Sequence, residues 1–168
     1  MPQKDPLQVV RTLNELRNLR WQCVMIGDGP LMPAVKQAVQ EFGLNERFQF
    51  TGWVSGKEVL NWFDQSDILF MPSLSEGLPV VGVEALAKGL AIVASRVGGF
   101  VDLVEIDKNG YLIPEGDAAQ FSAPLRELLT DEDRLLSFRH ASLEKAKWFD
   151  INQIVEQYEQ IFQTVIKA

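Results

Sequence analysis

The chain has 168 residues, of which 46% are hydrophobic and 23% are charged, which is the composition of an ordinary globular domain. A domain of this length buries about 70% of the surface that its unfolded chain exposes. Sixteen Lys and Arg residues against 23 Asp and Glu residues give a formal net charge of −7. This negative net charge argues against binding to nucleic acid or to an anionic membrane through the electrostatic field of the whole chain. Composition also excludes a disordered chain, a collagen-like repeat and a disulfide scaffold.

The chain carries one cysteine, Cys23, and one histidine, His140. No intrachain disulfide can form, and Cys23 is expected to be a small buried hydrophobe in a reducing, cytoplasmic compartment. One cysteine and one histidine do not make a zinc site of the usual kind. A Ser-His-Asp site would need His140, and the sequence has no G-x-S-x-G turn to present a serine. No segment approaches the roughly 18 uncharged apolar residues of a membrane span, and the first residues lack the apolar core of a signal peptide.

Short apolar runs alternate with helical patterns along most of the chain. Strands are expected at residues 21–26, 47–51, 67–71, 90–94 and 111–114. Helices are expected between them at residues 6–18, 31–42, 55–63, 79–88 and 100–106. The strands lack polar alternation, which is typical of parallel strands covered on both sides. The fold class is therefore α/β, a Rossmann-like parallel sheet with helices on both faces.

Ligands of such sheets bind outside the carboxyl ends of the strands, which draws attention to the loops after the strands. The loop Gly27-Asp-Gly-Pro30 contains Gly27 and Gly29, which let the backbone turn sharply and approach a ligand, and both are candidate substrate-binding residues. A dinucleotide fingerprint would need a glycine at position 32, which is Met32. This excludes an NAD-dependent dehydrogenase and leaves a plain tight turn as the alternative.

After residue 114 the pattern is entirely helical. Asp117 is expected to cap a helix that Pro124 kinks or restarts, and Thr130 is expected to start another. Asp150 is expected to cap a last helix with an apolar stripe on one face. The stripe consists of Ile151, Ile154, Val155, Tyr158, Ile161, Phe162 and Val165. We expect it to pack across a domain boundary.

The run from Glu76 to Glu84 (EGLPVVGVE) carries the strongest chemical signal. Glu76 ends a strand-exit loop at the start of a helix, where unpaired N–H groups carry a partial positive charge. Pro79 has no N–H, so the donors available at this helix start are the amides of its four neighbours. These amides could hold a phosphate or diphosphate. They belong to Gly77, Leu78, Val80 and Val81.

Glu84 lies on a helix that is apolar nearly all round, where a carboxylate needs hydrogen-bonding partners. Two ligand hydroxyls, such as a ribose diol, would provide them. The alternative is that Glu84 pairs with a Lys, an Arg or a backbone amide. For Glu76 the alternative is a carboxylate that only caps the helix.

Residues 72–99 resemble the signature of the retaining, GT-B-fold glycosyltransferases of family 4, also called glycosyl transferases group 1. That signature has two glutamates in an E-x7-E spacing, as in Glu76 and Glu84, followed by A-x-A-x-G and a later glycine pair. Here these are ALAKG, which ends at Gly89, and Gly98–Gly99. Shorter motifs at 27–30, 50–54, 67–73 and 109–114 follow the family's order and spacing, so the resemblance covers essentially the whole chain.

The resemblance implies an enzyme of two Rossmann-like domains. Such enzymes move a sugar from a nucleotide-diphospho-sugar to an acceptor hydroxyl, with retention of configuration and without a bound metal or other cofactor. Residues 1–168 would form the C-terminal, donor-binding domain, which on its own would bind donor weakly or not at all and would catalyse no transfer. The N-terminal acceptor domain would be missing from this chain, and any membrane contact would come only through that domain.

The resemblance also assigns roles by motif position. Glu76 would touch the donor sugar near the reacting carbon, and Glu84 would bond the ribose hydroxyls. The amides after Glu76 would hold sugar hydroxyls and the β-phosphate, while Lys4 would bind the diphosphate. The backbone of Val54 would contact the base.

The chain departs from the family pattern in four places. The family's arginine five positions before Lys4 would fall before Met1, and so would the first strand, which is central in a 3-2-1-4-5-6 sheet. The loss of that strand predicts a gap between the strands at 21–26 and 67–71, unless they close up or another chain fills it. Val80 stands where asparagine is frequent, and Asp102 stands where a glutamate usually follows the glycine pair.

Two other functions remain open at this point. The chain could be a non-catalytic nucleotide-sugar binding module that functions at this short length. It could also be a different enzyme on the same scaffold, such as an epimerase, which would need an acid and base pair of its own.

Overall fold

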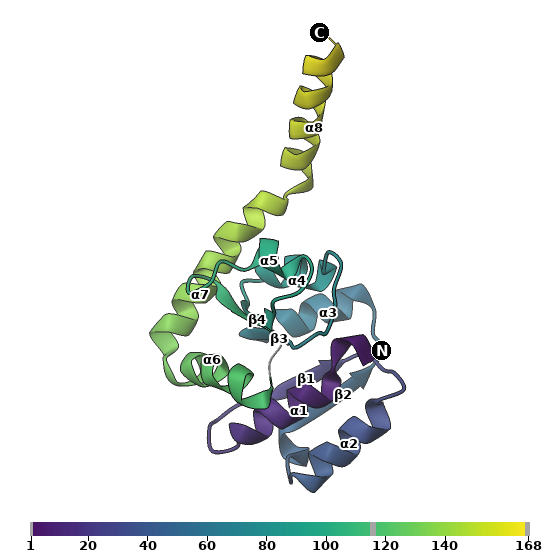
Figure 1. The fold of residues 1–168 in the computed structure, drawn as a ribbon, viewed down its shortest axis with the longest axis vertical. Coiled ribbons are helices and arrows are strands. Elements are labelled where there is room, and N and C mark those ends of the chain that lie inside the picture. The colour runs from purple at the N-terminus through teal and green to yellow at the C-terminus, as the bar shows by residue number, and fades with distance from the viewer. Residues whose placement is uncertain (1, 115–116, 167–168) are drawn as a thin grey trace.

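The computed structural model describes residues 2–114 and 117–166. Strands and helices alternate as predicted (Figure 1). The strands are β1 (Cys23–Ile26), β2 (Phe48–Gly52), β3 (Ile68–Met71), β4 (Ala91–Ser95) and β5 (Gly110–Ile113). The α-helices are α1 (Pro6–Glu15), α2 (Met32–Glu41), α3 (Gly56–Phe63), α4 (Val80–Ala87), α5 (Phe100–Leu103), α6 (Ala118–Thr130), α7 (Glu132–Ala146) and α8 (Ile151–Ile166). Short 3-10 helices are η1 (Pro2–Lys4), η2 (Asn45–Arg47) and η3 (Lys147–Phe149).

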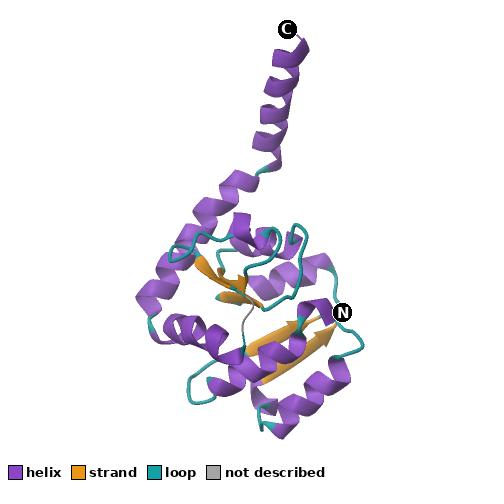
Figure 2. Ribbon diagram, in the orientation of Figure 1, coloured by secondary structure: helices purple, strands orange, loops and turns teal. Residues whose placement is uncertain are grey.

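The strands form two parallel sheets. β1 pairs with β2, and β4 lies between β3 and β5 (Figure 2). Within residues 2–114 and 117–166 no ladder joins β1 to β3. The gap predicted between these two strands is therefore confirmed, and in the described residues β1 and β3 each keep one edge without a strand partner.

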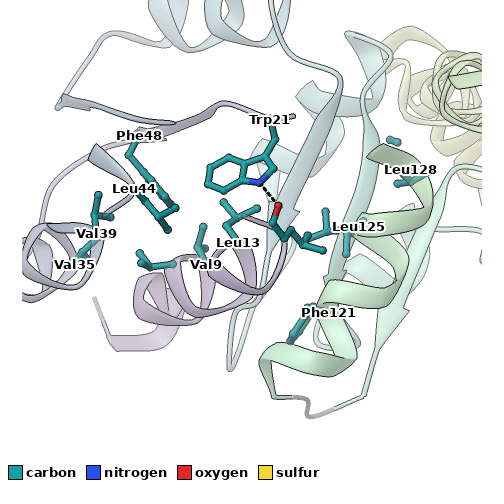
Figure 3. Packing of buried hydrophobic residues seen from close by; sticks show 14 of the residues in the cluster. Val9, Leu13, Trp21, Val35, Val39, Leu44, Phe48, Phe121, Leu125 and Leu128 are labelled. Carbon is teal, nitrogen blue, oxygen red and sulfur yellow. Dashed lines mark hydrogen bonds between the residues drawn. The ribbon is translucent and has the colours of Figure 1, made fainter. Parts of the chain in front are cut away.

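Helices cover both faces of the β3–β5 sheet, as predicted. Successive residues of β4 point to opposite sides, so Ala91 and Val93 enter one hydrophobic cluster while Ile92 and Ala94 enter the other. The first cluster takes side chains from α1, α2 and α6 (Figure 3), and the second takes them from α3, α4 and α5. Because α1 packs against both α2 and α6, the first cluster spans the two sheets.

Several helix starts follow directly from the sequence. The hydroxyl of Ser55 accepts a hydrogen bond from the amide of Glu58, and the carboxylate of Glu58 accepts one from the amide of Ser55 at 2.9 Å. The Ser55 hydroxyl also donates to the Glu58 carboxylate at 2.7 Å, and this bond, together with the one from the Ser55 amide, lowers the pKa of Glu58. Asp117 and Asp150 cap α6 and α8 as predicted.

Some predicted boundaries are wrong. The strand predicted from residue 21 begins at Cys23, because Trp21 turns into the first cluster and its indole Nε1 donates to the carbonyl of Leu16 at 2.8 Å (Figure 3). The first helix ends at Glu15 rather than near residue 18, and α5 ends at Leu103 rather than at residue 106.

Of the two outcomes expected at Pro124, a kink or a restart, the restart is wrong, because Pro124 lies inside the unbroken α6. Packing of Phe121 and Leu125 into the first cluster holds the helix together across the missing N–H. Thr130 is the last residue of α6, and Asp131 caps α7 by accepting from the amide of Arg134 at 2.9 Å.

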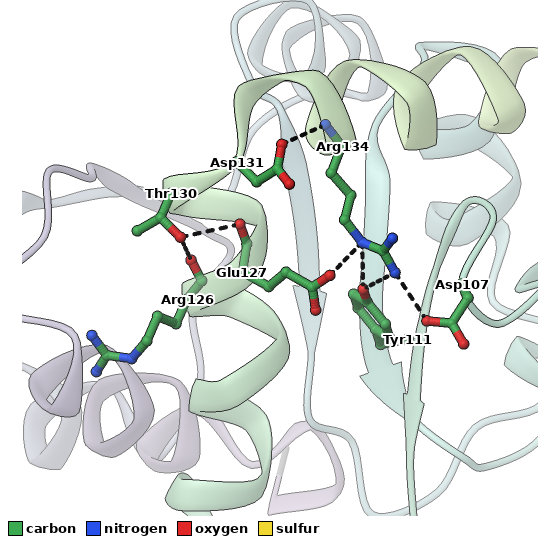
Figure 4. A network of polar contacts seen from close by, with 7 residues as sticks. All are labelled: Asp107, Tyr111, Arg126, Glu127, Thr130, Asp131 and Arg134. Atoms are coloured by element: carbon green, nitrogen blue, oxygen red, sulfur yellow. Dashed lines mark hydrogen bonds and ion pairs between the residues drawn. The ribbon is translucent and has the colours of Figure 1, made fainter.

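A polar network ties the helical hairpin of α6 and α7 to β5 (Figure 4). The guanidinium of Arg134 donates to the Tyr111 hydroxyl at 2.8 and 3.0 Å and pairs with Asp107 at 3.1 Å. Glu127 of α6 forms a further ion pair with Arg134. Burial raises the pKa of the Tyr111 hydroxyl.

The last helix, α8, extends away from the rest of the chain (Figure 1). Five residues of its predicted stripe are exposed, and Ile154 is half-buried. The exposed ones are Ile151, Val155, Tyr158, Ile161 and Phe162. The side chain of Val165 lies outside the described residues. No helix in the described ranges has both the length and the apolar content to span a membrane.

Candidate functional site

The loop between β3 and α4 brings together two predicted site residues. The side chain of Glu76 is only 7% exposed, and its Oε1 accepts a hydrogen bond from Lys4 Nζ at 2.6 Å. The side chain of Lys4 is 44% exposed. The two residues lie 72 positions apart in the sequence, and the fold makes them neighbours.

The short helix η1 is held against this loop by main-chain contacts. The carbonyl of Gln3 accepts a hydrogen bond from the amide of Leu74 at 2.8 Å. The side-chain amide of Gln3 donates to the carbonyl of Ser75, also at 2.8 Å. Lys4 is thereby fixed beside Glu76. Sequence reasoning missed Gln3, because a polar residue near a terminus carries no pattern.

The start of α4 offers free hydrogen-bond donors next to this ion pair. Pro79 is the N-cap residue, with no side-chain cap, and it has no N–H of its own. The amides of Gly77, Leu78, Val80 and Val81 donate to no partner among the described residues. The side chains of Leu78 and Val80 are 65% and 64% exposed. The unpaired amides and the partial charge of the helix end suit an anionic group.

Glu84 lies four residues beyond Val80 on α4, about 6 Å further along the helix axis. It is half-buried. In the part of the chain that the structure describes, its carboxylate has no ion pair and accepts no hydrogen bond. Pairing with a Lys or an Arg, the alternative considered above, is therefore not found there.

The remaining predicted residues lie at the ends of β1 and β2. The amide of Gly27 donates to the carbonyl of Gly52 at 2.8 Å, and Gly27 has a φ of 105° that favours glycine. The amide of Gly29 donates a hydrogen bond to the side-chain carboxylate of Asp28 at 2.7 Å. Val54 is half-buried in the loop after β2. The arrows of β1 and β2 point toward the N-terminal end of the chain, where η1 carries Lys4 (Figure 2).

Two other features of the described residues lie apart from these loops. A groove of about 490 Å³ runs between α2 and β2, lined by residues such as Lys36, Gln40 and Phe50, and it contains none of the predicted site residues. In the ranges 2–114 and 117–166, no three His, Cys, Asp or Glu residues gather as metal ligands.

The family model described as glycosyl transferases group 1 matches residues 2–147. The chain belongs to the glycosyl transferases group 1 family. The amylovoran biosynthesis glycosyltransferase AmsK of Erwinia amylovora is 34% identical over 118 residues, which are 67% of this chain and 29% of AmsK. The chain thus spans less than a third of the length of this relative.

Solved structures share its fold. Anabaena Alr3699/HepE in complex with UDP superposes with a TM-score of 0.86 at 21% identity, over 98% of this chain and 46% of that one. The C-terminal domain of LpcC, a glycosyl transferase group 1 family protein from Francisella tularensis, has a TM-score of 0.81 at 22% identity. That match covers 88% of this chain and 80% of the domain. This group 1 chain therefore has the Rossmann-like fold of a GT-B C-terminal domain.

Proposed function

We propose that this group 1 chain is the donor-binding half of a retaining glycosyltransferase. In this proposal it binds a nucleotide-diphospho-sugar, whose sugar passes to an acceptor hydroxyl. The observation that carries the proposal is the pair of Lys4 and Glu76 beside the uncapped start of α4. A cation, free amides and a carboxylate within one loop match a ligand that carries both a diphosphate and sugar hydroxyls. The UDP complex of the structurally similar Anabaena protein supports this class of ligand.

The donor would lie along the start of α4. Its diphosphate would accept hydrogen bonds from the amides of Gly77 and Leu78, and Glu76 would accept one from a sugar hydroxyl. Glu84, which has no described partner, would accept from the two ribose hydroxyls. The base would lie toward Val54 and the Gly27 loop, at the ends of β1 and β2.

Lys4 would contribute to the chemical step through charge. When the nucleoside diphosphate leaves, negative charge builds on the β-phosphate, and a cation and helix amides already aimed at it stabilise the transition state. In this proposal Lys4 exchanges its bond with Glu76 for one with the phosphate, which frees Glu76 for the sugar. The chain's own cation and amides would then serve without a bound metal or other cofactor.

The proposal needs a second domain for the acceptor, outside residues 1–168. The exposed stripe of α8 supports this, because an apolar face of this size is usually covered in the intact protein. We propose that α8 packs against the N-terminal acceptor domain. A cytoplasmic location is part of the proposal, since a lone Cys23 fits a reducing compartment.

Isothermal titration of UDP-, GDP- and ADP-sugars into the wild-type chain and Glu84→Ala tests the proposal. We expect one nucleotide class to bind the wild type, and the variant to bind it at least about tenfold more weakly, because charge-assisted hydrogen bonds to the ribose are lost. Glu132→Ala is the matched control, since Glu132 is exposed in the first turn of α7.

Equal affinity of Glu84→Ala and the control would contradict the assignment of Glu84. No binding of any nucleotide-sugar to the wild type would contradict the proposed function of this chain.

A further inference from the structure

We propose that the Gly98–Gly99 turn is a positioning element for the donor loop, which we define as residues 76–79. This inference rests on the proposed function, because it concerns how the amides for the donor are aimed. The turn lies between β4 and α5 and contacts no ligand in the proposal. Its role would be to hold the donor loop at a fixed place and angle.

Gly98 approaches the donor loop so closely that no side chain fits between them. A Cβ at Gly98 would lie 1.9 Å from the carbonyl oxygen of Glu76 and 2.8 Å from that of Gly77. The obstacle is backbone, which cannot rotate away as the end of a side chain can. Gly98 also has a φ of 50°, which favours glycine.

Gly99 makes the second contact. Its amide donates to the carbonyl of Gly77 at 2.7 Å. A Cβ at Gly99 would lie 2.9 Å from Pro79 Cδ and 3.1 Å from Leu78 Cα. Gly99 has a φ of −67°, which any residue adopts, so only the close approach requires glycine here.

A third contact anchors the same two segments one turn further on. Gly82 of α4 faces α5, where a Cβ would lie 2.5 Å from Leu103 Cδ1 and 3.1 Å from Phe100 Cε1. Phe100 and Leu103 are fully buried. The turn is therefore fixed to the core by α5, and it transmits that rigidity to the donor loop.

These contacts aim the donor amides because a peptide unit is planar and trans. The carbonyl of Glu76 and the N–H of Gly77 belong to one such unit and point in opposite directions. The same holds for the carbonyl of Gly77 and the N–H of Leu78. Contacts of Gly98 and Gly99 with these two carbonyls therefore fix where both N–H groups point, which is away from the turn.

Four glycine-to-alanine variants separate close approach from backbone strain. Gly98→Ala introduces both effects, and Gly99→Ala introduces the contact alone. Gly43→Ala introduces backbone strain alone, because Gly43 has a φ of 67° and a Cβ there would meet nothing within 4 Å. Gly56→Ala introduces neither effect. Should Gly98→Ala prove unstable, Gly99→Ala still tests the proposal, because its backbone is unstrained.

Each variant is titrated with UDP-glucose and with uridine, and its amide spectrum is recorded by NMR. We expect the two turn variants to lose at least about tenfold in affinity for UDP-glucose while uridine binding changes by less than about twofold, since uridine needs only Glu84 and the base site. A general loss of stability would weaken both ligands alike. We also expect the Gly77 and Leu78 resonances to shift in the turn variants and to stay in place in the controls.

Turn variants that bind UDP-glucose as well as Gly43→Ala does would overturn the inference. Wild-type chain that binds neither these two ligands nor the GDP- and ADP-sugars of the titration above would instead contradict the proposed function. In that case the resonances of Gly77 and Leu78 still decide the inference, and unchanged positions in both turn variants would refute it.

Discussion

The two sheets of this chain differ in how well they are enclosed. Every residue of β4 is buried, and its neighbours β3 and β5 are half-buried or better. All four residues of β1 are half-buried or exposed, and only Phe48 of β2 is buried. The same kind of apolar strand is thus fully buried at the centre of one sheet and only partly covered in the other.

The loops at the strand ends show the same contrast. A Cβ at Gly27 or Gly52 would meet nothing within 4 Å, whereas one at Gly98 would meet backbone at 1.9 Å. The loops of the β3–β5 sheet are set by packing, and those of the β1–β2 sheet are joined by hydrogen bonds such as that between Gly27 and Gly52. We infer that the phosphate and sugar part of the proposed site is preformed, while the base part depends on the less enclosed sheet.

A matched pair of valine substitutions tests the contrast in packing and has the largest expected effect. Val93→Ala in β4 removes fully buried methyl groups and should lower the free energy of unfolding by about 2–3 kcal/mol. Val24→Ala in β1 removes half-buried ones and should cost about 1 kcal/mol. Urea denaturation measures both values. Equal losses would show that the two sheets are equally well packed.

The reactivity of Cys23 tests whether the open edge of β1 admits solvent to the shared core. Cys23 packs against the first cluster, and burial raises the pKa of its thiol to about 12. At pH 8 we therefore expect a disulfide reagent to modify the folded chain at least about a hundredfold more slowly than the urea-unfolded chain.

The contribution of Cys23 to the free energy of unfolding depends on pH with a definite sign. Because the folded pKa is raised, the stabilising contribution of the protonated thiol is present below the unfolded pKa of about 8.5 and is lost as the pH rises toward 12. Equal rates of modification in the folded and unfolded chain would show that the thiol is exposed to water. Solvent would then enter the first cluster through the gap between β1 and β3.

Much of the fold could be predicted from local patterns. The capping pair of Ser55 and Glu58 marks the start of α3, and the apolar runs mark all five strands. The predictions that failed depend on packing between distant segments. Trp21 leaves its strand because its indole reaches Leu16, and Pro124 is tolerated because α6 is held by the core.

The site could be predicted in part. The motif selected Glu76, and the resemblance selected Lys4, which the structure brings to 2.6 Å from it. Neither indicated that Gln3 holds η1 to the loop or that Gly98 rests on a carbonyl of Glu76. Such contacts join residues more than 20 positions apart, and spacing along the sequence does not report how closely two backbones approach.

An amide NMR titration of the chain with the nucleotide-sugar that binds in the isothermal titration tests directly whether the start of α4 holds the donor. We expect the resonances of Gly77, Leu78, Val80 and Val81 to shift together and to saturate with the ligand. Shifts confined to the groove between α2 and β2, around Gln40 and Phe50, with the donor-loop amides unmoved, would contradict this expectation.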